Sequence, residues 1–128
     1  KSSPRKVKAT IDFARKTLQG GTSLVVFPEG ARTFTGHLGV FRKGAFQLAD
    51  DLQLPIVPMT INGSFDILPR TKGFNFVRHH KLQLLIHDPI YPTSRSAEDI
   101  LAIKDQAYDA IMRGLPPHYQ GYVKNDDQ

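Results

Sequence analysis

The chain has 128 residues, of which 40% are hydrophobic and 23% are charged, a composition typical of a single globular domain. No apolar run approaches the ~20 residues that a membrane-spanning helix needs. The absence of cysteine excludes disulfides, thiolate metal sites and cysteine nucleophiles. The 17 basic and 12 acidic residues give a net charge of +5, which favours an anionic partner.

Hydrophobic periodicity predicts three long helices, at about residues 4–18, 43–52 and 97–113. Gly20 and Gly21 end the first helix. Ser96, with Asp99 three residues later, predicts a capping box at the start of the last helix. A single helical turn is expected over residues 65–68.

Three short apolar runs predict β-strands, over residues 24–27, 56–61 and 81–87. The first run is continuous, which is typical of a strand buried on both faces of a parallel sheet. Pro58 within the second run indicates an edge position or an interruption. The element order indicates an α/β fold, with a mixed, mostly parallel sheet flanked by helices. A right-handed βαβ crossover is expected between the first two strands.

The sequence F-P-E-G-A-R-T, residues 27–33, directly follows the first predicted strand. Ligands of open α/β sheets bind at the carboxyl ends of strands. The guanidinium of Arg32 can hold two phosphate oxygens, and Gly30 allows the backbone to approach an anion. Glu29 repels phosphate, so we expect it to orient Arg32 or to accept a hydrogen bond from a substrate hydroxyl. Residue chemistry alone fits a candidate anion site and an ordinary surface Glu–Arg pair about equally well.

The histidines show no spacing typical of a zinc site, so no metal site is expected.

Residues 27–33 resemble the third signature block of the glycerophospholipid acyltransferases, F-P-E-G-T-R-S. Ala31 and Thr33 stand where Thr and Ser are usual. Residues 54–59, L-P-I-V-P-M, resemble the fourth block, a buried strand that contains a proline. Further residues follow the third block with the family's spacing, namely Gly36, Leu38, Phe41, Lys43 and Gly44.

The resemblance implies a partial glycerolipid-acyltransferase-like fold. It also implies transfer of an acyl group from a thioester, acyl-CoA or acyl carrier protein, to a lysophospholipid or glycerol-phosphate acceptor in phospholipid biosynthesis. No resident cofactor is expected. The substrate-binding residues that the resemblance implies are Glu29, Gly30, Arg32, Thr33, Lys43 and Pro58.

The catalytic pair of this family, a His with an Asp five positions later, is absent from the sequence. The residues five positions after the five histidines are Arg42, Leu84, Leu85, Pro92 and Val123. We therefore interpret residues 1–115 as the C-terminal part of an acyltransferase domain that lacks its catalytic part. Residues 116–128 are expected to be a polar, frayed tail. Such a part should expose apolar surface, self-associate and be inactive alone.

The resemblance also implies a location on the cytoplasmic side of a membrane, with the protein peripheral or anchored through a preceding part. A non-catalytic anion- or lipid-binding module would carry the same residues in the candidate site and remains the main alternative. A nucleic-acid-binding function is disfavoured, because the aromatic residues, 9% of the chain, do not alternate with the basic ones as a stacking surface requires.

Overall fold

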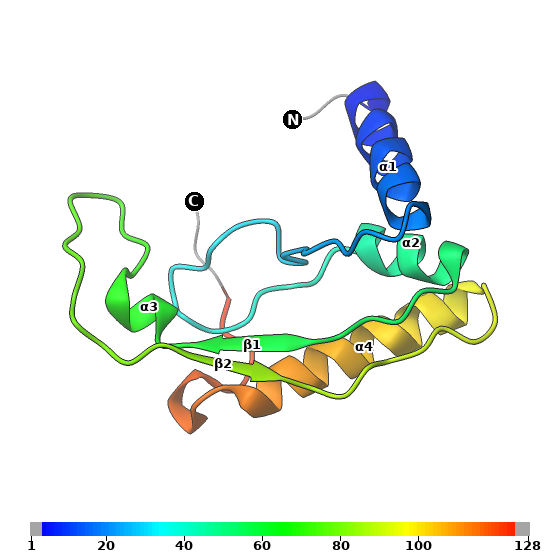
Figure 1. Ribbon diagram of the computed structural model, residues 1–128. Coiled ribbons are helices and arrows are strands. Elements are labelled where there is room, and N and C mark those ends of the chain that lie inside the picture. The colour runs from blue at the N-terminus through cyan, green and yellow to red at the C-terminus, as the bar shows by residue number, and fades with distance from the viewer. Residues whose placement is uncertain (1–3, 125–128) are drawn as a thin grey trace.

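The computed structural model describes residues 4–124, with the elements arranged as in Figure 1. The elements in chain order are α1 (Pro4–Gln19), α2 (Gly44–Leu52), β1 (Met59–Asn62), α3 (Ser64–Ile67), β2 (Gln83–Ile86), α4 (Ala97–Gly114) and the 3₁₀ helix η1 (Pro117–Tyr119). The three predicted long helices and the predicted helical turn are confirmed, with ends shifted by one residue at most. Among the described residues, no helix combines the length and apolar character needed to cross a bilayer.

The two strands, β1 and β2, form an antiparallel sheet in which Met59 lies opposite Ile86 and Asn62 opposite Gln83. An isolated antiparallel bridge between Ile56 and Ile90 continues the pairing beyond Pro58. Pro58 directly precedes β1, where the missing amide removes no ladder bond, so the predicted interruption is confirmed. The predicted mostly parallel sheet is wrong for residues 4–124, whose sheet is small and antiparallel.

The apolar run Leu24–Phe27 is not a strand. It pairs with no strand among the described residues, and the exposure of its side chains ranges from 45% for Leu24 to 77% for Val25. A strand needs a hydrogen-bonded neighbour, and residues 4–124 offer none at this position. The expected βαβ crossover is therefore also wrong for the described chain.

Helix α4 lies against β1, and side chains of β1 satisfy carbonyl groups at the end of this helix. The Thr60 hydroxyl donates to the Ile111 carbonyl oxygen at 3.0 Å. The Asn62 side-chain amide donates to the Gly114 carbonyl oxygen at 2.9 Å. A Cβ atom at Gly114 would lie 2.4 Å from the Thr60 hydroxyl oxygen, so this close approach requires glycine. Carbonyls that a helix end leaves unpaired are thus bonded by the strand.

The outward side chains of β1 and β2 form an apolar surface. Met59 and Ile61 are 43% and 42% exposed, and their cross-strand partners Ile86 and Leu84 are 66% and 55% exposed. Side chains alternate between the two faces of a strand, and the inward Thr60 is fully buried. The apolar surface expected from the sequence is therefore present, as a sheet face together with the unpaired run Leu24–Phe27.

The hydrophobic core joins α4, α2 and the loop that precedes α2. Ile103 and Ala107 of α4 are 1% and 2% exposed. They pack in one cluster with Phe46 of α2 and with two loop residues, Leu38 and Phe41. The loop that carries the candidate site is therefore fixed by its own buried side chains.

Hydrogen bonds to the backbone amide and to the side chain of Asp99 hold the start of α4. The Ser96 hydroxyl accepts from the Asp99 amide at 3.1 Å, which confirms the predicted N-cap. The Asp99 carboxylate accepts from the Thr93 amide at 2.7 Å, the Thr93 hydroxyl at 2.8 Å and the Ser94 amide at 3.2 Å, and makes no return bond to Ser96. These bonds, led by those from Thr93, lower the pKa of Asp99 to about 2.

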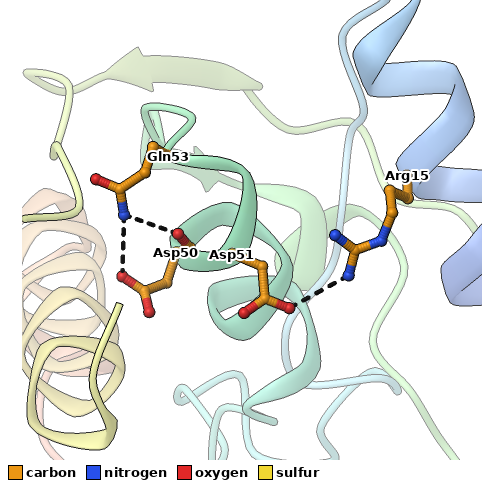
Figure 2. A network of polar contacts seen from close by, with 4 residues as sticks. All are labelled: Arg15, Asp50, Asp51 and Gln53. Atoms are coloured by element: carbon orange, nitrogen blue, oxygen red, sulfur yellow. Dashed lines mark hydrogen bonds and ion pairs between the residues drawn. The ribbon is translucent and has the colours of Figure 1, made fainter. Parts of the chain in front are cut away.

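A second carboxyl, Asp50 of α2, is buried at 1% exposure and hydrogen-bonds Asp99. Burial, followed by that hydrogen bond, raises the pKa of Asp50. Figure 2 shows Gln53 beside it, donating to the Asp50 carbonyl oxygen at 2.8 Å. The adjacent Asp51 points the other way and pairs with Arg15 of α1 at 3.3 Å. Asp50 and Asp99 thus form a hydrogen-bonded contact between α2 and α4.

We predict that Asp50→Asn stabilises the chain at neutral pH. The pKa of Asp50 is raised, so its proton contributes stability below about pH 4, and this contribution is lost as the pH rises through the folded pKa. Asparagine donates to Asp99 without binding a proton. Thermal unfolding between about pH 4 and pH 8 should show an advantage of Asp50→Asn that grows with pH.

The matched control is Asp51→Asn, which alters the neighbouring carboxylate, 41% exposed, and should shift the melting temperature little at any pH. Asp99→Asn should destabilise at neutral pH, because the low pKa of Asp99 means that its carboxylate contributes stability above about pH 4, lost as the pH falls through about 2. An Asp50→Asn advantage independent of pH would contradict the raised pKa of Asp50 as its cause.

Candidate anion-binding site

The candidate site is a loop whose two ends are joined by backbone hydrogen bonds. The Arg42 amide donates to the Pro28 carbonyl oxygen at 2.9 Å, and the Gly30 amide donates to the Phe27 carbonyl oxygen at 3.0 Å. Gly30 has a φ of 75°, in the left-handed region that favours glycine. Residues 27–42 therefore form a closed loop with a tight turn at Gly30.

Glu29 holds this loop together from inside. Its Oε2 atom accepts a hydrogen bond from the Gly39 amide at 2.7 Å. Burial raises the pKa of Glu29, and the bond from Gly39 acts against that rise. The sequence-based hypothesis had Glu29 orienting Arg32 or contacting substrate. The structure gives its carboxylate a backbone partner ten residues further along the loop.

Arg42 lies against the glycine turn from the opposite end of the loop. A Cβ atom at Gly30 would lie 2.8 Å from the Nε and Cζ atoms of Arg42. The Arg42 guanidinium therefore borders the same turn as the backbone amide of Gly30. The substrate-binding residues expected from the sequence include its neighbour Lys43 and not Arg42. The signal for Arg42 is its place directly after Phe41, the buried residue that brings the end of the loop to Pro28.

Arg32 and Thr33 follow the glycine turn. Arg32 is exposed, and within residues 4–124 its guanidinium makes no hydrogen bond or ion pair. Its carbonyl oxygen accepts from Arg70, whose guanidinium also lies 4.3 Å from the ring centre of Phe34. Thr33 is half-buried, and its methyl group lies 3.6 Å from where a Cβ atom of Gly39 would be. The backbone around Arg32 is thus fixed, and its charge is directed to solvent.

Two other predicted site residues lie apart from this arrangement. Lys43 is the exposed N-cap residue of α2, and its side chain makes no capping hydrogen bond. Pro58 is buried beside β1, where its carbonyl oxygen accepts from the His87 amide at 3.0 Å. Pro58 takes no part in the hydrogen bonds that fix Glu29 and Arg42. Glu29, Gly30, Arg32 and Thr33 are therefore brought together in one loop, while Pro58 belongs to the sheet.

Tyr119 and Gly121 contact this loop, so the expected fraying is wrong for this part of the tail, while residues 125–128 lie outside the described residues. Tyr119 of η1 lies against Gly36, where a Cβ atom would be 2.7 Å from the tyrosine ring. Its hydroxyl donates to Asp66 of α3 at 2.6 Å. Burial, followed by this bond, raises the pKa of Tyr119 to about 12. In the sequence, the signal for this contact is an aromatic residue within a polar segment. Its partner Gly36 has a φ of 79°, in the region that favours glycine.

Taken together, the loop presents cations outward and its one acid inward. Arg32 follows the glycine turn, and Arg42 lies against it. The Arg70 guanidinium donates to the Arg32 carbonyl oxygen. The Glu29 carboxylate is turned toward Gly39. Guanidinium groups are suited to a phosphate or carboxylate, because they donate to two oxygens at once. The arrangement is therefore a candidate anion-binding site.

Comparison with known proteins places the chain in a family. The family model described as Acyltransferase matches residues 1–62, which include the whole loop. A chloroplastic 1-acyl-sn-glycerol-3-phosphate acyltransferase, BAT2 of Brassica napus, is 35% identical over 112 residues, covering 88% of this chain and 31% of its own length. The alpha form of this enzyme in Mus musculus is 27% identical, covering 79% of this chain and 35% of its own length.

A solved structure also matches. The crystal structure of the 1-acyl-sn-glycerophosphate acyltransferase PlsC from Thermotoga maritima superposes with a TM-score of 0.69 and 29% identity, over 81% of this chain and 42% of that one. The fold and the loop thus define an acyltransferase-type domain. More particularly, the chain belongs to the glycerophospholipid acyltransferase family, that of the 1-acylglycerol-3-phosphate acyltransferases. It spans about a third of the length of the curated relatives named above.

We predict that Glu29→Ala loosens the loop and Glu29→Gln does not. Alanine removes the acceptor of the Gly39 amide, whereas glutamine keeps an oxygen in the same place without the cost of burying charge. A bond to a charged acceptor contributes about 1.5–3 kcal/mol, so hydrogen exchange of the Gly39 amide should accelerate roughly tenfold to a hundredfold in Glu29→Ala.

The control for this measurement is Asp12→Ala, which removes an exposed carboxylate on α1 and should leave Gly39 exchange unchanged. Equal acceleration in Glu29→Gln and Glu29→Ala would show that the negative charge, and not only an oxygen acceptor, holds the loop.

Proposed function

We propose that the protein transfers an acyl group from a thioester, acyl-CoA or acyl carrier protein, to the hydroxyl of a lysophosphatidate-type acceptor. Residues 27–42 then supply the site for the acceptor phosphate. The observation that carries this proposal is the outward pair Arg32 and Arg42 at the glycine turn of a loop that resembles the third acyltransferase block. The relatives named above are 1-acyl-sn-glycerol-3-phosphate acyltransferases, which supports the same acceptor class.

The loop residues have distinct roles in this proposal. Arg32 binds two phosphate oxygens through its guanidinium, and Arg42 adds a second cation from the other end of the loop. The backbone at Gly30 lets the phosphate approach the turn. Glu29 acts as a positioning residue, because it fixes Gly39 and hence the shape of the loop. Holding the acceptor in place converts a bimolecular encounter into a positioned one.

The bond-making step needs a general base, and the His and Asp pair of this family is absent from these 128 residues. The acceptor oxygen attacks the thioester carbonyl, the carbon–sulfur bond breaks, and the hydroxyl proton moves to the base and then to the departing thiolate. No histidine in the sequence has an aspartate five positions later. We propose that such a pair lies elsewhere in the protein and that the protein works at the cytoplasmic side of a membrane. A non-catalytic lipid-binding module is the alternative that activity assays distinguish.

We predict that Arg32→Ala lowers kcat/KM for the acceptor roughly tenfold to a hundredfold in the complete enzyme, since each charge-assisted bond contributes about 1.5–3 kcal/mol. Arg32→Lys should recover only part of the loss, because an ammonium cannot bind two oxygens as a planar fork does. Steady-state kinetics with varied lysophosphatidate measure the effect.

The matched control is Arg5→Ala, which removes an exposed arginine of α1 and should leave kcat/KM unchanged. If Arg32→Ala has no effect and Arg42→Ala does, the phosphate binds against Arg42 and the assignment to Arg32 is wrong.

We also predict that the 128-residue chain alone releases no thiol from acyl-CoA in the presence of lysophosphatidate above the uncatalysed rate. Adding the part of the protein that carries the His and Asp pair should restore transfer. Turnover by the chain alone that depends on Arg32 would contradict this division of roles.

A further inference from the structure

The segment between α3 and β2, residues 69–81, combines exposed apolar side chains with four lysine and arginine residues. Phe74 is 102% exposed, Phe76 81% and Val77 73%. The segment contains no acidic residue. Its basic residues are Arg70, Lys72, Arg78, His79, His80 and Lys81. In Figure 1 this green segment extends beyond α3 and beyond the end of the sheet.

Hydrogen bonds within the segment and at its base hold this conformation. The Arg78 amide donates to the Ile67 carbonyl oxygen at 2.8 Å, which ties the far end of the segment to α3. The Thr71 hydroxyl donates to the Gly73 carbonyl oxygen at 3.2 Å, and the Asn75 side chain donates to the Pro69 carbonyl oxygen. The polar groups of the segment therefore bond to one another, and the phenylalanines remain outside.

The chemistry of this surface differs from that of the other exposed apolar surface. The outward face of β1 and β2 is apolar and carries no charge between its members, which suits another layer of protein. In residues 69–81 the apolar side chains lie between basic ones. Aromatic side chains in the acyl–headgroup boundary, with lysine and arginine at the headgroups, are the pattern that binds anionic bilayers.

We propose that residues 69–81 bind the surface of an anionic membrane, with Phe74, Phe76 and Val77 inserted at the interface. Arg78 and Lys81 then lie at the level of the lipid phosphates. Arg70 of the same segment bonds the backbone at Arg32, so the membrane surface and the candidate phosphate site are adjacent. The inference rests on the membrane location in the proposed function and deepens it by naming the segment that meets lipid.

The test uses the fact that the sequence has no tryptophan. Phe74→Trp places a single indole in the segment, and Tyr91→Trp places one at a position 65% exposed outside it. Each variant is mixed with phosphatidylcholine vesicles with or without phosphatidylglycerol, and with brominated acyl chains as quencher. Phe74→Trp should shift its emission to the blue and be quenched with phosphatidylglycerol only, and Tyr91→Trp should do neither.

Vesicle sedimentation provides the second measurement. Phe74→Ser combined with Phe76→Ser should weaken binding to phosphatidylglycerol vesicles about tenfold or more, because two buried aromatic side chains are lost. Arg78→Glu should weaken it roughly fivefold or more and reduce its salt dependence. Phe13→Ser, at a 73% exposed position of the basic helix α1, is the matched control and should bind as the unaltered chain does.

Several results would overturn the proposal. These are absence of binding to phosphatidylglycerol vesicles, equal blue shifts at positions 74 and 91, or a larger loss from Phe13→Ser than from the double serine variant. A blue shift of Phe74→Trp that rises with protein concentration without lipid would assign the segment to a second copy of the chain. Displacement from vesicles by single-stranded DNA that itself shifts Phe74→Trp would assign it to nucleic acid. None of these readouts depends on acyl transfer, so their failure leaves the proposed transfer reaction untouched.

Discussion

The burial of Leu38 and Phe41 against α4 is the constraint on which the rest of this structure depends. Both residues lie in the long loop that carries the candidate site, and both contact the cluster around Ile103 and Ala107. Phe41 also packs edge-to-face against Tyr108, with ring centres 5.0 Å apart. A loop of this length would be expected to be mobile if it were polar throughout. Here the core fixes its second half, and the Glu29–Gly39 bond transmits that rigidity to the glycine turn.

The helices and the approximate positions of β1 and β2 could be predicted from the sequence, but the pairing of the strands could not, for a physical reason. A helix bonds to itself, so periodicity and caps such as Ser96 suffice to locate it. A strand exists only with a partner, and the sequence of Leu24–Phe27 does not say whether a partner is present. The same limit applies to direction, because β1 and β2 have the same apolar pattern in either orientation. Their antiparallel register is fixed by tertiary contacts, among them the bonds from Thr60 and Asn62 to α4.

The residues of the candidate site likewise fall into those that the sequence identifies and those that only the fold brings together. Glu29, Gly30, Arg32 and Thr33 form a contiguous block, so the sequence identifies them together, and the structure keeps them together. Arg42 comes to Gly30 only because the loop closes at Pro28. Tyr119 comes to Gly36 only because α4 ends beside β1 and places η1 there. Contacts across such distances in the chain require the fold, and a motif read along the sequence cannot contain them.

The acid in this basic loop has a structural explanation. A carboxylate next to a bound phosphate costs energy through repulsion, and half-burial raises that cost, as the raised pKa of Glu29 indicates. The Gly39 amide offsets part of it with a charge-assisted bond of about twice the strength of a neutral one. The charge of Glu29 also affects Tyr108, whose pKa is raised first by burial and then by Glu29. Glu29 is therefore turned inward, where it fixes the loop, while the arginines remain available to an anion.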